Sequence, residues 1–265
     1  MSTSFSIKKR IVLLVGAAGG IGAPTAKHLA SEGAFVILMD HEGSAEKLAA
    51  LLKEIQTAGG EGEAFPCDIT SDEKCAAVMK EILEAYEVDS LVFVAGFVNI
   101  KSVLTGQPQD LLDQVNVHAC SVMRLSKPLI PLWLKAGRGD AIVLTSIAGE
   151  LPAIDKHIYS ASKAAATALV QGLAGSYGGR GLRFVPVLAN RVGTPSAIER
   201  AEQSEAHMAE MMSTQLSKKW ITPEEVAKTF HFLLSDGARP INGDPFYITD
   251  GSKATLAARP TPVTS

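Results

Sequence analysis

The chain has 265 residues, 46% of them hydrophobic and 20% charged, which is enough to bury a substantial core. Its formal net charge is −3 and no basic block occurs, so we expect no nucleic-acid partner. No apolar run approaches the ~20 residues that span a bilayer, so we expect no membrane partner. The cysteines, Cys67, Cys75 and Cys120, lack metal-ligand spacing, which predicts no metal site and fits the reducing cytoplasm.

The first apolar run resembles a targeting segment. Residues 8–10 are basic and residues 11–15 are apolar, which imitates the start of a secretory signal peptide. The run then breaks into the glycine-rich segment 16–22. A strand followed by a tight turn is therefore the better interpretation.

Short apolar runs alternate with longer helical segments along the rest of the chain. The runs are rich in β-branched residues, as parallel strands covered on both faces should be. This alternation implies βαβ units with right-handed crossovers and a parallel sheet. We predict strands at 11–15, 35–39, 91–95, 141–145, 184–188 and 244–249, and helices at 24–32, 45–58, 72–86, 110–134 and 160–177.

The domain organisation is simple. No internal repeat or linker divides the chain, so we predict one domain over 1–265 with flexible ends at 1–7 and 253–265. Segment 194–220 is polar and charged and contains three methionines. It is either an insertion that covers a pocket mouth, as a substrate lid, or a pair of surface helices with methionine as core filler.

A further helix is expected after this segment. Thr222 is placed to be its N-cap, with Pro223 at the first helical position. Glu225 stands three residues after Thr222 and completes a capping box.

The glycine-rich segment lies where a Rossmann fold binds a dinucleotide pyrophosphate, between a strand and a helix. Glycines let backbone N–H groups approach the phosphates, and the helix N-terminus adds partial positive charge. Such a turn alone also suits a methyltransferase, or is merely a tight turn. The strand–turn–helix context favours a nucleotide. We therefore predict an α/β fold: a Rossmann-type, doubly wound parallel sheet with helices on both faces.

Asp40 follows the second strand, where a carboxylate can accept hydrogen bonds from an adenosine ribose. It would repel a 2′-phosphate, so it favours NAD over NADP. An exposed aspartate at a strand end is the alternative. Asp68 and Ile69 follow the third strand and are placed to hold the adenine edge, although in isolation Asp68 is only a plausible loop residue.

Tyr159 and Lys163 stand at i and i+4, so on a helix their side chains are neighbours. An ammonium that close should lower the pKa of the phenol from its free value of about 10. A phenol tuned toward neutrality can exchange a proton with a substrate hydroxyl. Ser146 lies thirteen residues before Tyr159. The pair is weak evidence alone, because helices carry such pairs by chance.

With these parts in this order, the chain resembles the classical short-chain dehydrogenase/reductase family from about Lys9 to Ser252. The glycine turn matches the family's G-x-x-x-G-x-G motif, and 145–149 matches its Ser-Ser-x-x-Gly segment. Segments 222–226 and 248–252 resemble its C-terminal helix and last strand. The remaining matches are Asp68 for the adenine-contacting aspartate, Asn116 for the helix asparagine, Ser146 for the catalytic serine, and Tyr159 and Lys163 for Y-x-x-x-K.

The resemblance implies a catalytic set and a cofactor, NAD. Tyr159 would be the general acid or base, Ser146 would bond the substrate oxygen, and Lys163 would hold the nicotinamide ribose. Asn116 would position a water that links Lys163 to solvent. The cofactor-binding residues expected are Gly16, Gly19, Gly20, Ile21, Gly22, Asp40, Asp68, Ile69, Ala95, Gly96, Tyr159, Lys163, Val192 and Thr194.

Two positions depart from the family pattern. The family usually has Asn-Asn-Ala-Gly after the fourth strand, and here Phe93 and Val94 precede Ala95 and Gly96. The family usually has Pro-Gly after the sixth strand, and here the pair is Ala189-Asn190. Asparagine tolerates left-handed φ, so we expect Asn190 to replace that glycine.

The substrate wall is expected near Glu150, Leu151, His157 and Arg191. Arg191 either pairs with an anionic substrate or with a carboxylate of the protein. His157 either tunes the site or is a plain loop histidine. If Arg191 binds the substrate, Arg191→Ala should raise KM for an acidic substrate.

The leading function is an NAD(H)-dependent oxidoreductase that interconverts a secondary alcohol and a ketone on a small to medium substrate. The alternatives are a non-redox enzyme of the same fold (lyase, dehydratase or isomerase with bound NAD) and an NAD-binding sensor or scaffold. The resemblance also implies a homo-oligomer, a tetramer or dimer, with 110–134 and 160–177 at the interface. Small residues from Ala164 to Gly172 permit close packing there or within the monomer.

Overall fold

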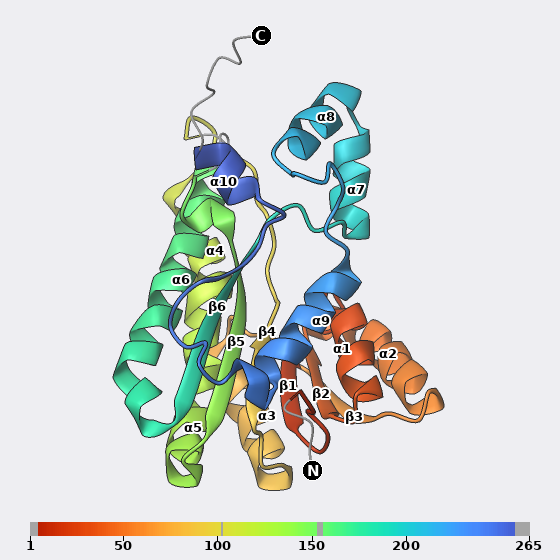
Figure 1. The fold of residues 1–265 in the computed structure, drawn as a ribbon. Helices are drawn as coiled ribbons and strands as arrows, with labels where there is room; N and C mark the ends of the chain where they lie inside the picture. Colours follow the sequence, from red (N-terminus) through yellow and green to blue (C-terminus); the bar gives the residue numbers. More distant parts are fainter. Residues whose placement is uncertain (1–4, 102, 153–155, 258–265) are drawn as a thin grey trace.

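Seven parallel strands form one sheet in the computed structural model, which describes residues 5–101, 103–152 and 156–257. The strand order is β3-β2-β1-β4-β5-β6-β7, and every neighbouring pair runs parallel (Figure 1). The strands are β1 (Ile11–Val15), β2 (Phe35–Asp40), β3 (Glu61–Pro66), β4 (Ser90–Phe93), β5 (Gly139–Ser146), β6 (Leu182–Ala189) and β7 (Phe246–Ile248). The order reverses beside β1, so the loops after β1 and β4 flank the topological switch point, where such sheets bind ligands.

Helices cover both faces of the sheet, as predicted. One face carries α1 (Gly22–Ser31), α2 (Ala45–Thr57) and α9 (Pro223–Leu234), and the other carries α3 (Asp72–Ala85), α5 (Ser121–Ala136) and α6 (His157–Tyr177) (Figure 1). Successive strand residues alternate between the two cores. Val12 and Leu14 pack into the first, and Leu13 and Val15 into the second. Successive side chains of a strand point to opposite faces, and here both faces are covered by an apolar core. The central strands therefore appear in the sequence as continuous apolar runs.

The helix expected over 110–134 is interrupted. The structure has α4 (Pro108–Val115), a π-helical turn over Asn116–Cys120, and then α5. A π turn inserts one extra residue into the helical ladder and is frequent at functional sites. The turn redirects His118, whose side chain is buried.

The edge strand β3 is missing from the predicted ranges. Its residues alternate between exposed and partly buried positions, and only Phe65 is fully buried. An edge strand with one solvated side has no continuous apolar run. The capping box at Thr222 is confirmed, with Pro223 at the first helical turn and Glu225 bonded back to Thr222.

The predicted flexible ends are too wide. Ile7 is buried in the core of the first layer, so the end of 1–7 is packed, whereas Phe5 is 54% exposed. Residues 252–257 form a short helix, α10 (Ser252–Ala257), in which Lys253 pairs with Glu150. Burial of Ile7 and the ion pair of Lys253 thus hold residues that the sequence composition predicted to be flexible. Residues 1–4 and 258–265 lie outside the described residues.

Segment 194–220 contains two helices, α7 (Pro195–Glu202) and α8 (Glu205–Ser213). They stand apart from the two helical layers (Figure 1). Several residues of this segment line the large pocket described below. None of the helices within the described residues is both long and apolar enough to cross a bilayer.

A buried charge cluster ties the sheet together at the amino ends of its strands. Asp140 is the second residue of β5 and is fully buried. Its carboxylate accepts from Arg10 at 2.5 Å, Arg183 at 2.7 Å and Arg239 at 2.8 Å. Arg183 is itself 2% exposed and donates to two backbone carbonyls. The cluster lies at the opposite end of β5 from Ser146, so it supports the site only through the sheet.

Candidate active site

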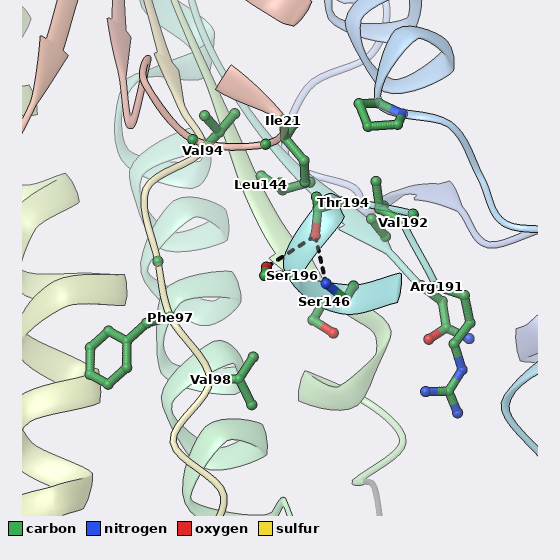
Figure 2. Close-up of a pocket in the computed structure, with 18 of the residues that line it drawn as sticks. Ile21, Val94, Phe97, Val98, Leu144, Ser146, Arg191, Val192, Thr194 and Ser196 are labelled. Atoms are coloured by element: carbon green, nitrogen blue, oxygen red, sulfur yellow. Dashed lines mark hydrogen bonds between the residues drawn. The ribbon is translucent and has the colours of Figure 1, made fainter. Parts of the chain in front are cut away.

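A large cavity of about 2300 Å³ lies over the carboxyl ends of the strands. The turn after β1, the loop after β4, the end of β5, the start of α6 and segment 189–197 contribute to its walls. Figure 2 shows Val94 and Val98 on one wall and Val192 and Thr194 on the opposite wall, with Leu144 and Ser146 between them. The cavity is large enough for a dinucleotide and a small organic substrate together.

The glycine turn is shaped for close approach. Gly16 has φ +87°, and a Cβ there would meet the Ala95 nitrogen at 2.6 Å. A Cβ on Gly22 would meet the Gly16 carbonyl oxygen at 1.9 Å, and one on Gly20 would meet the Thr194 side chain at 2.9 Å. The turn therefore touches the loop after β4 and the wall at Thr194, and only glycine fits these contacts. Gly19 and Gly20 are exposed to the cavity with the N-terminus of α1 behind them, so the turn fits a pyrophosphate.

The reactive side chains meet at the other end of the cavity. Ser146 ends β5, where its Oγ accepts the Ala148 N–H at 3.2 Å, and it hydrogen-bonds Tyr159. Tyr159 and Lys163 both lie on α6, and Lys163 Nζ is 5.8 Å from the centroid of the Tyr159 ring. Lys163 is buried and donates to the Leu144 carbonyl at 3.2 Å. The i, i+4 spacing thus places the ammonium beside the phenol, as predicted.

The predicted lowering of the Tyr159 pKa is wrong for the protein alone. Burial raises the pKa of the Tyr159 phenol above its usual value, and the hydrogen bond with Ser146 and the charge of Arg200 only partly oppose it. Burial also lowers the pKa of Lys163 to about 8, so the ammonium itself is destabilised. Desolvation penalises both charged forms, and it outweighs the attraction that the spacing suggested.

His118 lines the cavity and was not identified from the sequence. Its Nδ1 lies 2.8 Å from Ser162 Oγ, which donates to the Tyr159 carbonyl at 2.7 Å. Its Nε2 accepts the Phe97 N–H at 3.3 Å, so Nδ1 carries the hydrogen in the neutral ring. Burial and then the charge of Lys163 lower the pKa of His118 to about 2, so the ring stays neutral.

The His118 ring joins the loop after β4 to α6. Its edge packs on the Tyr159 ring with centroids 5.6 Å apart, and a Cβ on Gly96 would meet its Nε2 at 2.9 Å. The His118 side chain thus holds the loop after β4. In the family pattern two asparagines precede the Ala-Gly pair of this loop, and in this chain Phe93 and Val94 take their place. The only sequence signal was a histidine two residues after Asn116, and the π turn that aims it was not predictable.

The predicted site residues divide into two groups. One group lines the cavity: Gly16, Gly19, Gly20, Ile21, Gly22, Gly96, Ser146, Tyr159, Lys163, Val192 and Thr194. The other lies outside its lining: Asp40, Asp68, Ile69, Ala95 and Asn116.

Two predicted adenosine contacts make local hydrogen bonds. Asp40 Oδ2 accepts the Ala18 N–H at 2.8 Å, and its Oδ1 accepts the His41 N–H at 2.7 Å. Asp40 thus braces the glycine turn from the end of β2. Asp68 Oδ1 accepts from the backbone and hydroxyl of Thr70, and these bonds lower the pKa of Asp68. Both carboxylates lie at or just after the end of a strand, and each keeps acceptor capacity.

A family model described as enoyl-(acyl carrier protein) reductase matches residues 16–253. A relative in Aquarana catesbeiana, dehydrogenase/reductase SDR family member 6, is 31% identical over 246 residues, 91% of this chain and 96% of the relative. The chain belongs to the short-chain dehydrogenase/reductase family.

Other members support the same assignment. The 7alpha-hydroxysteroid dehydrogenase of Bacteroides fragilis is 26% identical over 249 residues, 92% of this chain and 94% of that protein. A crystal structure of a putative NAD(P)-dependent gluconate 5-dehydrogenase from Beutenbergia cavernae, with bound NADP, is 25% identical and has a TM-score of 0.90. It covers 95% of this chain and 100% of its own. The oxidoreductase family and the Rossmann-type fold are therefore established for this chain.

Asn116, the family's helix asparagine, opens the π turn. Its carbonyl accepts from Ser121 Oγ at 2.9 Å. The expectation that Asn190 replaces the family's glycine in a left-handed conformation is wrong. Arg191 has the positive φ, +48°, while the Asn190 N–H donates to the Ile248 carbonyl at 3.1 Å. The bond to β7 keeps Asn190 in line with the sheet, so the chain turns one residue later.

A group of neighbouring cations contributes to the wall of the cavity. Lys156, Arg191 and Arg200 all line it. Burial, and then the charges of Arg191 and Arg200, lower the pKa of Lys156, so both guanidinium groups act on its ammonium. Among the predicted wall residues, Leu151 also lines the cavity, and Glu150 instead bonds Lys253 and Tyr247.

Proposed function

We propose that this chain is an NAD(H)-dependent oxidoreductase that interconverts a secondary alcohol and a ketone, with Tyr159 as general acid and base. The observation that carries the proposal is the meeting of Ser146, Tyr159 and Lys163 at one end of a cavity whose other end is the glycine turn. Bound NAD would supply or accept the hydride. The protein then has to align the substrate and move one proton.

The protein's own groups account for the proton. In the reducing direction, Tyr159 starts as a phenol, because its raised pKa keeps it protonated, and it donates to the carbonyl oxygen. Ser146 can donate a second hydrogen bond to that oxygen. Lys163 and the neutral His118 flank the ring, and Lys163 stabilises the phenolate left behind. The alcohol follows the reverse path in oxidation.

The proposal of NAD rather than NADP rests on Asp40. Its carboxylate braces the turn at Ala18, so its negative charge lies beside the expected ribose. Lys27 and Lys47 also line the cavity and are the cations that would favour a 2′-phosphate. The preference for NAD or NADP therefore depends on the balance between the Asp40 carboxylate and the ammonium groups of Lys27 and Lys47.

We expect wild type to bind NADH at least about tenfold more tightly than NADPH, a difference of ~1.4 kcal/mol. Asp40→Asn removes the charge but keeps the shape, so it should reduce this preference by about tenfold, because a nearby charge pair is worth ~1–4 kcal/mol. Titration calorimetry with both reduced cofactors measures it. Asp72→Asn, an exposed acid on α3, is the control and should keep the wild-type ratio. Equal affinity of wild type for the two cofactors would contradict the NAD assignment while leaving the redox assignment intact.

We also propose that the substrate bears a carboxylate or phosphate. Lys156, Arg191 and Arg200 support this, because they concentrate positive charge at the cavity's substrate end. Among the described lining residues, Glu224 is the one acid, and it belongs to the α9 side of the cavity. A hydroxy acid or keto acid therefore fits better than a neutral alcohol.

We retain the proposal that the chain forms a homo-oligomer. Leu112 on α4 and Met123 on α5 are 57% and 55% exposed, and Leu104 in the preceding loop is 94% exposed. Leu112 and Met123 belong to segment 110–134, which the family resemblance places at an interface, and a second copy would cover them.

A further inference from the structure

Two helix C-termini converge on one spot, away from the cavity. Helices α1 and α9 pack against each other, and each has a histidine in its last turn, His28 and His231. The rings of these histidines have centroids 5.3 Å apart. The C-terminal end of a helix carries partial negative charge and stabilises cations. Two such ends therefore favour a positive charge between them.

The two imidazoles are arranged as metal ligands are. His28 Nε2 lies 3.3 Å from His231 Nδ1. Two ligands ~2.0–2.1 Å from a tetrahedral Zn²⁺ are separated by about 3.3–3.4 Å. The rings are tilted by 56°, so both nitrogens can turn toward one point.

A backbone carbonyl sets the protonation of His231. Its Nε2 lies 2.9 Å from the Phe5 oxygen. A carbonyl only accepts, so Nε2 carries the hydrogen and Nδ1 presents its lone pair to His28. A metal-bound histidine almost always donates its other N–H to a carbonyl, carboxylate or water. The Phe5 ring packs against the Phe232 ring, with centroids 6.2 Å apart, and this contact helps to position the Phe5 carbonyl.

A third ligand is in reach. Glu32 stands four residues after His28, the spacing that puts two side chains on one helix face. Its carboxylate and the two imidazole nitrogens all lie within 4.8 Å of one another. Its side chain is exposed, so a rotamer change can close the remaining distance. The positive charge of Lys228 on α9 disfavours a cation near His28, and the negative charge of Glu32 offsets this effect.

We propose that His28 Nε2, His231 Nδ1 and the Glu32 carboxylate form a divalent transition-metal site, best suited to Zn²⁺, with water as the fourth ligand. Without metal, His28 donates a hydrogen bond to His231 instead. Spacing within the sequence could not reveal this site, because the two histidines are 203 residues apart.

The site would join the parts of the chain that frame the cavity. The first turns of α1 and α9, at Pro24 and Pro223, line the cavity, whereas His28, Glu32 and His231 do not. A metal at the far ends of these helices would fix their relative position and clamp the segment at Phe5. Its role is therefore structural and separate from the proposed redox chemistry.

Competition between the purified chain and a chromophoric chelator for ZnCl₂ tests the proposal. We expect one Zn²⁺ per chain, a higher Tm with ZnCl₂, and a Kd weakened at least ~100-fold in His231→Ala and ~10-fold in Glu32→Gln. His41→Ala and Glu84→Gln remove an exposed histidine and glutamate elsewhere and should bind as wild type.

Controls separate a lost site from a lost fold. The Tm of each variant without zinc shows whether it folds, and His28→Gln provides a second ligand deletion. Co²⁺ in place of Zn²⁺ should give the visible absorption of a tetrahedral site in wild type and not in His28→Gln. Zinc affinity equal to wild type in His231→Ala and His28→Gln, or no binding below millimolar ZnCl₂, would overturn the proposal.

Discussion

Tyr159→Phe is expected to lower kcat by about 10²–10⁴-fold, because it removes the proton donor and keeps the ring. The ring's contact with His118 and the position of Lys163 should survive, since neither requires the phenol oxygen. Cofactor affinity should therefore change little. Steady-state rates and NADH binding, measured on the same preparation, give both numbers.

Tyr177→Phe is the matched control for Tyr159→Phe. Tyr177 ends α6, far from the cavity lining, and packs against Phe184. The Tyr177→Phe variant should retain the wild-type kcat. A Tyr159→Phe enzyme with kcat within threefold of wild type would show that another group carries the proton.

Asp140→Asn is expected to lower the free energy of unfolding by about 3–5 kcal/mol, the cost of breaking a buried ion pair from one side. The substitution removes the charge that compensates Arg10 and Arg183, both buried. Urea denaturation measures the loss. Glu84→Gln, at an exposed pair with Lys80 that lies outside the cluster, should cost under about 1 kcal/mol.

The same carboxylate predicts a pH dependence. Burial alone would raise the pKa of Asp140, but Arg183 and Arg10 hold it below the usual value of 3.8. Between the two pKa values the unfolded chain binds more protons, so this stability is present above pH ~4 and is lost as the pH falls toward the folded pKa. Wild type should lose stability on acidification more steeply than Asp140→Asn. Parallel pH profiles for the two proteins would contradict the assigned role of the cluster.

The fold was largely predictable because the central strands are buried on both faces. Such strands read as apolar runs between helical segments, and β1 over Ile11–Val15 was predicted to the residue. The edge strand β3 was not, since Glu61 and Glu63 break its apolar pattern. The hydrophobic pattern of a sequence reflects burial, so it predicts the central strands of a sheet better than its edge strands.

The site was predictable where chemistry follows spacing along one element. Tyr159 and Lys163 are neighbours because α6 makes them so. Their pKa values were not predictable, because burial depends on how α6 packs on β5. His118 was missed for a similar reason: the π turn that follows α4, rather than the spacing, points the ring at Ser162.

In the reaction we propose, hydride passes between a nicotinamide ring and a carbinol carbon in this cavity while Tyr159 moves the proton. Incubating the chain with NAD⁺ and a panel of secondary alcohols deuterated at that carbon, neutral and acidic, tests it by mass spectrometry of the cofactor. We expect deuterium in the reduced nicotinamide, the largest kcat/KM with hydroxy acids, and little label with Tyr159→Phe. Cofactor that binds to the chain but stays unlabelled and unreduced across the whole panel would contradict it.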